Sequence, residues 1–252
     1  VNFGNEIEII NIPETGFEHL EVSRDIFESV DGFAENSNAQ FTTKIIDKAG
    51  NETLGSSDGT IIHIDETVPT LDSVTISTNN ILSDNWATIS DTIALTFLSS
   101  EGLNVVTAIV SNDTIVVDGS MNETLHIGKY LVSPFDPDGD ISFDVSYVDT
   151  AGNQGISITE TTDGTVVGID NTNPSINALL EGADNLDPTY YNNSDTITLY
   201  WNMEDTTSGI RESYYALGSE PNEINVVGWT TGGIEGSGGW SALGLENNNT
   251  YY

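Results

Sequence analysis

The 252-residue chain carries 40 acidic but only 5 basic side chains, so its formal net charge is −35. A charge of this sign and size disfavours nucleic acid and anionic lipid as partners. The chain has no cysteine, which excludes disulfides and cysteine-based zinc or redox sites. No apolar run reaches the roughly 18 residues of a membrane-spanning helix, so we expect no direct membrane insertion.

Three phrases recur along the chain with nearly one spacing. Asp47–Asn51 returns as Asp149–Asn153, Ile64–Pro69 as Ile169–Pro174, and Ser90–Leu95 as Ser194–Leu199, at spacings of 102, 105 and 104 residues. A period near one hundred residues is too long for a solenoid repeat and matches one whole β-sandwich domain. The sequence therefore predicts a tandem array.

Extending this period in both directions predicts three units. We expect a partial domain over residues 1–65 that lacks its first strands, a complete domain over 70–170, and a partial domain over 175–252 that lacks its last strands. Missing strands would leave open sheet edges that other polypeptide must cover. The sequence therefore suggests a segment of a longer chain held within an assembly.

Strands are predicted where apolar and polar residues alternate, in Thr92–Phe97, Ile141–Tyr147 and Thr196–Trp201. The residues expected to face inward are Ile93, Leu95, Phe97, Ile141, Phe143, Val145, Tyr147, Ile197, Leu199 and Trp201. Turn-forming residues such as Ala49-Gly50-Asn51 and Pro137-Asp138-Gly139 separate such runs. Short strands with frequent turns predict an all-β fold of tandem antiparallel β-sandwiches.

The order of these features resembles tandem immunoglobulin-like domains of bacterial and archaeal surface proteins. The resemblance rests on Asp-x-Ala-Gly-Asn, a following turn, a strand ending in Ile-Asp, and Thr-x-Pro opening the next unit, and it covers the first two units. It implies that Phe41–Ile46 and Ile141–Val148 are F strands and that Gly59–Ile64 and Gly164–Ile169 are G strands. An extracellular location at the cell surface is also implied.

The third unit instead resembles a fibronectin type III-like domain. The resemblance rests on Ser208–Ile210, Tyr214–Gly218, Gly228–Thr230 and Leu245–Tyr251. Leu245 and Tyr251 stand where that family has the Leu and Tyr of its tyrosine corner. Both families are scaffolds with many functions, so the fold alone names no activity.

The sequence contains no recognisable catalytic motif. His19, His63 and His126 lie in separate segments without the spacing of metal ligands. A Gly-x-Ser-x-Gly elbow, a phosphate-binding glycine loop and a cysteine nucleophile are all absent. We therefore expect that this segment is not an enzyme.

Calcium is the ligand that the acidic residues favour, because this hard cation takes six to eight oxygen ligands. One candidate site is Asp136-Pro-Asp138-Gly-Asp140, whose carboxylates could converge around a glycine turn. The alternative interpretation is a solvated polar turn.

The other candidate calcium sites are the domain boundaries. One groups Asp65 and Glu66 with Asp47, and the other groups Asp170 and Asn171 with Asn173 and Asp149. Acidic residues before a proline are similar to the calcium-rigidified linkers of cadherin-type arrays. The alternative is a strand end where Asp and Asn cap turns and Pro69 or Pro174 fixes the entry to the next domain.

Five Asn-x-Ser/Thr sequons are possible glycan acceptors in a secreted chain: Asn51, Asn112, Asn122, Asn192 and Asn248.

Two functions from different classes fit the sequence. The favoured hypothesis is a structural segment of a large extracellular cell-surface protein whose copies assemble with one another into an S-layer or a filament, with divalent cations between like charges. The alternative is the stalk of a secreted adhesin that projects a distant binding tip. Two different types of neighbouring domain favour the first, because a long row of near-identical repeats is typical of a stalk.

Overall fold

The computed structural model describes residues 38–40, 42–56, 59–119, 123–182, 190, 192, 195–233 and 236–252. Regular structure within these ranges consists of β-strands, and nearly all pairs are antiparallel. The all-β, antiparallel fold class expected from the sequence is confirmed. The described residues include no helix that is long and apolar enough to cross a membrane.

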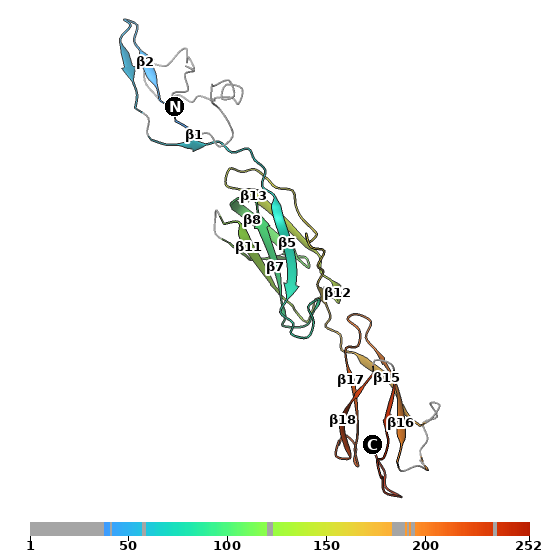
Figure 1. The fold of residues 1–252 in the computed structure, drawn as a ribbon. Coiled ribbons are helices and arrows are strands. Elements are labelled where there is room, and N and C mark those ends of the chain that lie inside the picture. Colours follow the sequence, from blue (N-terminus) through green and yellow to red (C-terminus); the bar gives the residue numbers. More distant parts are fainter. Residues whose placement is uncertain are drawn as a thin grey trace.

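The strands form three groups that follow one another along the chain and along the long axis of the molecule (Figure 1). The first group contains two small antiparallel pairs, β1 with β4 and β2 with β3. Their bounds are Asn38–Ala39 for β1, Lys44–Ile46 for β2, Glu52–Leu54 for β3 and Ile62–His63 for β4. The side chains described in these strands are exposed, so they form no buried core among the described residues of this group.

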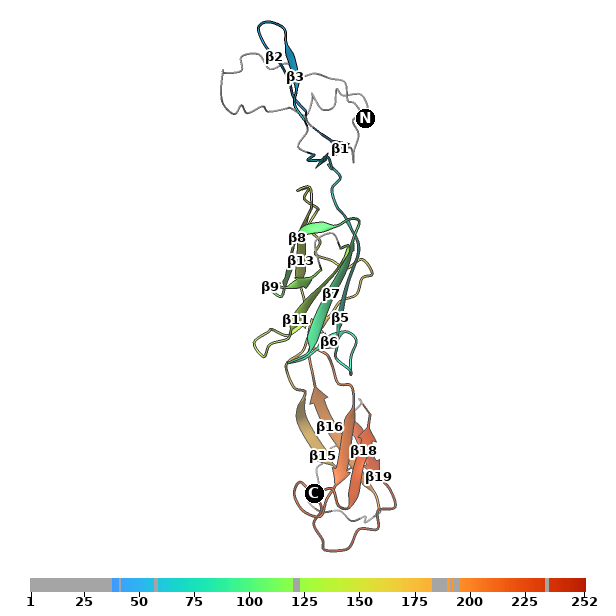
Figure 2. The same ribbon diagram turned by 90° about the vertical axis from the view of Figure 1, so that its left-hand side faces the viewer.

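The middle group consists of two main antiparallel sheets. The first has the order β10-β11-β7-β5, and the second has the order β13-β8-β9 (Figure 2). The bounds in the first sheet are Leu71–Thr78 for β5, Thr92–Ser99 for β7, Val117–Asp118 for β10 and Leu125–Leu131 for β11. Those in the second are Leu103–Val110 for β8, Asp113–Ile115 for β9 and Phe143–Asp149 for β13.

Side chains from both sheets form one hydrophobic core. β7 alternates buried and partly buried residues along most of its length, as does β13, because successive side chains point to opposite faces of a sheet. The inward positions predicted from the sequence are confirmed: Ile93, Leu95, Phe97, Phe143, Val145 and Tyr147 are buried, and Ile141 packs against them partly buried.

A short parallel pairing ties the beginning of the middle unit to its end. β14 (Gly168–Ile169) lies between β12 (Gly139–Asp140) and β6 (Trp86–Ala87), antiparallel to the first and parallel to the second. The amides of Gly168 and Asp170 donate to the carbonyls of Asn85 and Ala87, at 2.8 Å each. The close approach needs glycine at 168, because a Cβ there would lie 2.4 Å from the Trp86 ring.

The third group has a three-stranded sheet of order β15-β16-β19 and a two-stranded sheet of β17 and β18. The bounds are Ser175–Glu181 for β15, Ile197–Glu204 for β16, Ser213–Leu217 for β17, Val227–Gly232 for β18 and Ser237–Trp240 for β19. Ile197, Leu199 and Trp201 are buried as predicted, together with Leu217. Leu245 and Tyr251 pack against this cluster, and the Tyr251 hydroxyl accepts a hydrogen bond of 3.0 Å from the Glu246 amide.

Three of the strands implied by the resemblance are much shorter than expected. Gly59–Ile64 contributes only Ile62–His63, Gly164–Ile169 only Gly168–Ile169, and Phe41–Ile46 only Lys44–Ile46, with Phe41 outside the described residues. Gly164 and Val166 are exposed, and no described strand lies beside them to form the backbone hydrogen bonds of a sheet. Local alternation predicts which face is apolar, but the length of a strand depends on its neighbour.

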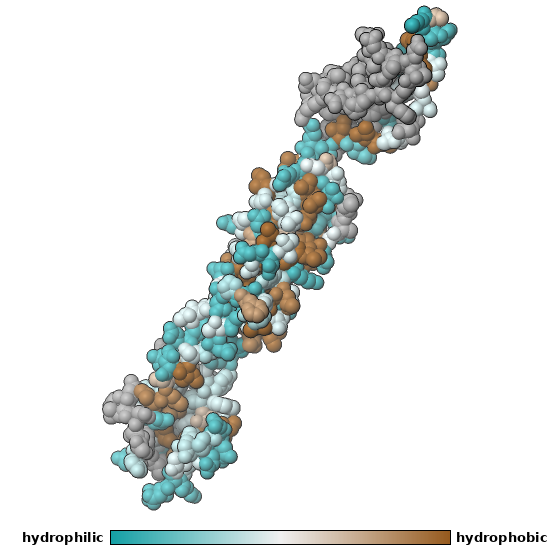
Figure 3. All heavy atoms as spheres, turned by 180° about the vertical axis from the view of Figure 1, so that it is seen from behind, coloured by the Kyte–Doolittle hydropathy of each residue, from teal (hydrophilic) through white to brown (hydrophobic). Residues whose placement is uncertain are grey.

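The surface mixes apolar and polar residues. On the face shown in Figure 3, apolar residues of the middle unit are interrupted by hydrophilic ones rather than joined in one band. Phe135 and Ile81 are almost fully exposed, at 92% and 96%.

Replacing Phe143 by alanine tests the register of the core. Phe143 is only 8% exposed, so Phe143→Ala should lower the free energy of unfolding by about 3–5 kcal/mol. Native-state hydrogen exchange of the β7 and β8 amides measures the free energy of unfolding of this unit separately from that of its neighbours. Ser142→Ala, at an exposed position in the same segment, is the matched control and should change little. A cost below about 0.5 kcal/mol for Phe143→Ala, typical of surface positions, would show that the register is wrong.

A buried histidine predicts a pH dependence. His126 is 2% exposed and stacks on Phe97 with 5.2 Å between ring centroids. Burial lowers the pKa of His126, and the nearby Glu123 opposes this only in part. The folded state therefore favours neutral imidazole, while the unfolded chain takes up a proton near its ordinary pKa of about 6.5.

The stability of the middle unit should accordingly be complete above about pH 6.5 and fall as the pH drops below it. Urea unfolding of the chain between pH 7.5 and 5 measures this slope. His126→Gln should flatten it, whereas His63→Gln, at an exposed position, should leave it unchanged. Equal slopes in the wild type and His126→Gln would contradict the assignment.

Candidate metal centre

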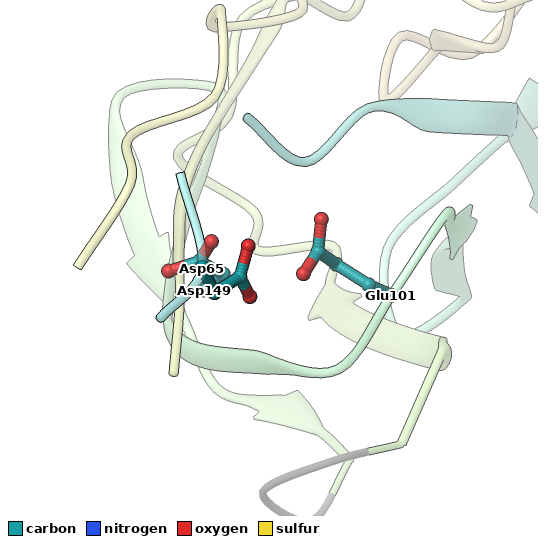
Figure 4. Close-up of side chains that lie close together, drawn as sticks. All are labelled: Asp65, Glu101 and Asp149. Carbon is teal, nitrogen blue, oxygen red and sulfur yellow. The ribbon is translucent and has the colours of Figure 1, made fainter. Parts of the chain in front are cut away.

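Three carboxylates meet at the junction between the first and middle units: Asp65, Glu101 and Asp149. One oxygen from each lies within 4.8 Å of the others. Figure 4 shows the three side chains close together. Asp65 lies in the linker between β4 and β5, Glu101 in the turn from β7 to β8, and Asp149 at the end of β13. Because β7 and β8 belong to different sheets, this turn crosses the pole of the unit where β13 also ends. Strand topology therefore brings together residues distant in sequence.

The Asp149 carboxylate is buried but well supplied with donors. Its Oδ1 accepts hydrogen bonds from the amides of Ala151, Gly152 and Asn153 at 2.9, 2.7 and 2.8 Å. Its Oδ2 accepts one from the Asn153 side chain at 2.9 Å. Gly152 makes this tight turn possible, with φ at +101°. Burial alone would raise the pKa of Asp149, but the bonds from Asn153, Gly152 and Ala151 outweigh it and lower the pKa. The group is therefore a carboxylate at neutral pH.

Asn153 also fastens the linker to the middle unit. Its side-chain nitrogen donates both to Asp149 Oδ2 and, at 3.0 Å, to the backbone carbonyl of Asp65. Asp65 is held in turn, because its Oδ1 accepts from the Thr67 amide at 3.1 Å. The linker carboxylate is thus positioned beside Asp149 by two local contacts.

This arrangement has the chemistry of a hard-cation site. Three negative groups at this separation repel one another, by on the order of 3–4 kcal/mol per pair at an effective dielectric constant of about 20. A divalent cation would reverse the sign of that interaction, and carboxylate oxygens are the ligands that calcium and magnesium prefer. Backbone carbonyls and water would complete the six to eight ligands of calcium. Asp65, Glu101 and Asp149 are the residues that would hold it.

The predicted grouping of boundary residues needs a correction. We expected Asp149 to share a site with Asp170, Asn171 and Asn173, and Asp47 to share one with Asp65 and Glu66. The structure instead places Asp149 with Asp65 at the first junction. The reason is that the chain after Asp149 runs back along the unit. It reaches Asp170 only after β14, at the junction with the third unit. In the middle unit, the phrase from Asp149 to Asn153 therefore faces the linker that precedes the unit.

The Asp47 phrase repeats most of the hydrogen bonds of the Asp149 phrase. Asp47 Oδ1 accepts from the amides of Ala49 and Asn51, and Oδ2 from the Asn51 side chain, at 2.8, 2.8 and 2.7 Å. Hydrogen bonds from the Asn51 side chain and amide lower the pKa of Asp47. Asp47 is exposed and does not take part in the three-carboxylate group.

Asp136, Asp138 and Asp140 are not brought together in this way. Asp136 accepts from the Tyr130 hydroxyl and the Ser133 amide, at 2.7 Å each, so it closes a turn within the unit. Burial and this bond to Asp136 raise the pKa of Tyr130 to about 12. Asp138 accepts from the Thr172 hydroxyl and the Asn171 amide, which lower its pKa, and Asp140 lies in β12. These contacts agree with the polar-turn alternative for this segment.

The second junction repeats part of the first. Asp170 Oδ1 accepts from the Thr172 amide at 3.1 Å, as Asp65 does from Thr67. The Ser208 amide lies 3.2 Å from Asp170 Oδ2 and 3.0 Å from Asp205 Oδ1, so it holds these two carboxylates close. Asn171 serves as a donor: its side-chain nitrogen bonds the carbonyls of Ser133 and Asp136. Glu66 is exposed at the first junction, outside the three-carboxylate group.

Glu101 is the site residue that the sequence did not reveal. It lies outside the three recurring phrases, and its counterpart at the repeat spacing of 104 residues is Asp205. The available signal for this site residue was an acidic residue just after the second long strand in both the middle and the third unit, β7 and β16.

The sequons lie on exposed positions where the structure describes them. Asn51, Asn112, Asn192 and Asn248 are exposed, and Asn122 lies outside the described residues. Asn112 and Asn248 sit in turns with φ of 72° and 65°. The Asn51 amide nitrogen already donates to Asp47. Glycosylation at these five positions stays a prediction.

Comparison with protein-family models, with curated proteins and with solved structures finds no match for this chain.

Neutralising one ligand tests the metal centre. Glu101→Gln removes one charge but keeps the shape of the side chain, so it should weaken calcium binding at the first junction at least about tenfold. Titration calorimetry gives the affinity, and calcium-dependent protection of linker amides near Asp65 from hydrogen exchange locates the site. Glu160→Gln, an exposed acid in the same unit, is the control for net charge. Equal calcium protection in both variants would exclude this site.

Proposed function

We propose that this chain is a structural segment of a large extracellular cell-surface protein that assembles into an S-layer or a surface filament. Its units are immunoglobulin-like in the first two positions and fibronectin type III-like in the third. Divalent cations, calcium first, stiffen the junctions between units. The partners are further copies of the same protein.

The observation that carries this proposal is the three-carboxylate group at the first junction. Two of its members belong to the middle unit, and Asp65 belongs to the linker that precedes it. A cation held there would fix the linker onto the unit by ionic contacts in addition to the hydrogen bond from Asn153. Binding would therefore convert a hinge into a rigid joint.

The charge of the chain supports an assembly that depends on cations. At −35 over 252 residues, neighbouring copies repel one another, and close packing requires counter-charge between them. Cations that coordinate carboxylates provide it locally, whereas monovalent salt only screens.

The structure also agrees with the alternative, the stalk of a secreted adhesin. The end-to-end order of the units in Figure 1 suits a projecting rod as well as a lattice subunit. Electron microscopy of native cell envelopes separates the two: a periodic array supports the assembly, and isolated projections support the stalk.

A structural role accords with the sequence, in which no catalytic motif is found. The histidines add to this: His126 is packed in the core against Phe97, and His63 lies on the surface of β4.

Chelation tests the proposed function directly. Small-angle scattering of the chain at low salt should show a long, narrow distribution of distances with calcium and a broader, shorter one after chelator is added. Glu101→Gln should behave like the chelated protein, and Glu160→Gln like the wild type. Sodium chloride at equal ionic strength should restore the rigid form only in part. Identical scattering with and without calcium would refute cation-stiffened junctions.

A further inference from the structure

Two opposite surfaces of the middle unit carry few charges. We call the outward positions of β7 and β11 the lysine face and those of β8 and β13 the aspartate face, after the charged residue that each contains. The inward positions of these strands form the core that both sheets share, so the two faces lie on opposite sides of the unit (Figure 2). The lysine face contains Ala94, Thr96, Leu98, Leu125, Ile127 and Lys129. The aspartate face contains Val105, Thr107, Ile109, Asp144, Ser146 and Val148.

The low charge of these faces is unusual for this chain. Most acidic side chains of the unit lie in turns or at strand ends, although the whole chain has a net charge of −35. Outward positions of an antiparallel sheet are normally polar because they face water. Here Leu98 and Leu125, directly opposite each other, are 39% and 52% exposed, and Val105 is 51% exposed. Both faces therefore leave apolar surface in solvent, and neither repels a neighbouring copy as the acidic turns do.

Each face has one charge without a counter-charge. Lys129 lies opposite Ala94, and Asp144 lies opposite Ile109. The side chains of Lys129 and Asp144 form no ion pair or hydrogen bond with any described residue. This holds even for Lys129 and Asp118, which lies on the neighbouring strand β10. A lysine that is unpaired in so acidic a chain is available to a carboxylate on another molecule, so the two faces are complementary in charge.

The two charges lie at the same height along the unit. β7 and β13 both end at the pole of the first junction. Ala94, the cross-strand neighbour of Lys129, lies five residues before the end of β7 at Ser99. Asp144 likewise lies five residues before the end of β13 at Asp149. A sideways shift of one copy, with no stagger along the long axis, therefore brings Lys129 of that copy against Asp144 of the next.

We propose that the lysine face of one copy packs against the aspartate face of the next, so that copies form a row of parallel, unstaggered molecules. The contact rests on the proposed function, in which copies of the chain assemble, and supplies the surface that they use. Because two different faces meet, each copy leaves one face free for another, and the row stays open. Apolar and threonine side chains exclude water as in the packing of one sheet on another. Lys129 and Asp144 set the register.

Charge reversal tests which faces meet. Lys129→Glu places like charges across the contact, and so does Asp144→Lys, so each should weaken self-association of the full chain at least about tenfold. The double variant Lys129→Glu/Asp144→Lys restores opposite charges and should associate within about threefold of the wild type. Lys48→Glu, at an exposed position of the first group, makes the same change in net charge as Lys129→Glu and should have no effect. Sedimentation velocity over a range of concentrations, at fixed calcium and low salt, measures the association.

Cross-linking locates the contact even where association is weak. A carbodiimide couples a lysine amine directly to a carboxylate without a spacer. In a mixture of isotope-labelled and unlabelled chain, a link that contains one peptide of each kind joins two copies, and mass spectrometry identifies both peptides. We expect such links between Lys129 and Asp144 to outnumber those from Lys129 to any other acid.

Failure of the rescue would overturn the proposal, because a double variant as weak as the single ones would show that the two residues do not meet. Equal self-association of the wild type and both single variants would place the contact elsewhere on the chain. A chain that stays monomeric, with Lys129 linked only to Asp118 of the same copy, would also overturn it. Each of these results leaves the proposed function open to support from a periodic array in native envelopes and from calcium protection at the first junction, so the two fail separately.

Discussion

The burial of one negative charge governs the first junction. Asp149 is fully buried, and a charge can remain there only because three backbone amides and the Asn153 side chain point at it. Supplying those donors fixes the turn from Ala151 to Asn153. The same turn places Asn153 against the linker carbonyl at Asp65. The orientation of the linker thus follows from how one carboxylate is satisfied.

The balance at this site is between attraction to local dipoles and repulsion from like charges. Hydrogen bonds keep Asp149 ionised, and the same burial that makes those bonds strong also strengthens the repulsion from Asp65 and Glu101. An exposed phrase with most of the same hydrogen bonds, at Asp47, faces no such conflict because solvent surrounds it. The difference between two nearly identical sequence phrases therefore lies in their surroundings.

Sequence reasoning was strongest where the physical cause is local. Alternation in Thr92–Phe97 and Ile141–Tyr147 is sufficient to predict the buried residues, since a strand turns every second side chain to the same face. The lengths of β4 and β14 were overestimated. A strand extends only as far as a neighbouring strand offers backbone hydrogen bonds, and the sequence of the segment itself does not specify that neighbour. At the candidate site, Asp65 and Asp149 were both singled out but assigned to different groups. Only the strand topology shows which pole each one occupies, and it alone brings in Glu101.

The parallel pairing of β6 with β14 has a mechanical consequence. The linker from the first unit joins the middle unit at the pole where β13 ends, and the chain leaves toward the third unit just after β14. Tension along the long axis pulls on these two ends in opposite directions. The bonds from Gly168 and Asp170 to Asn85 and Ala87 run across the strands, so tension loads them together in shear rather than opening them one at a time. A row of such units would resist stretching until the whole clamp failed in one step, which suits a layer or rod that has to keep its shape under load.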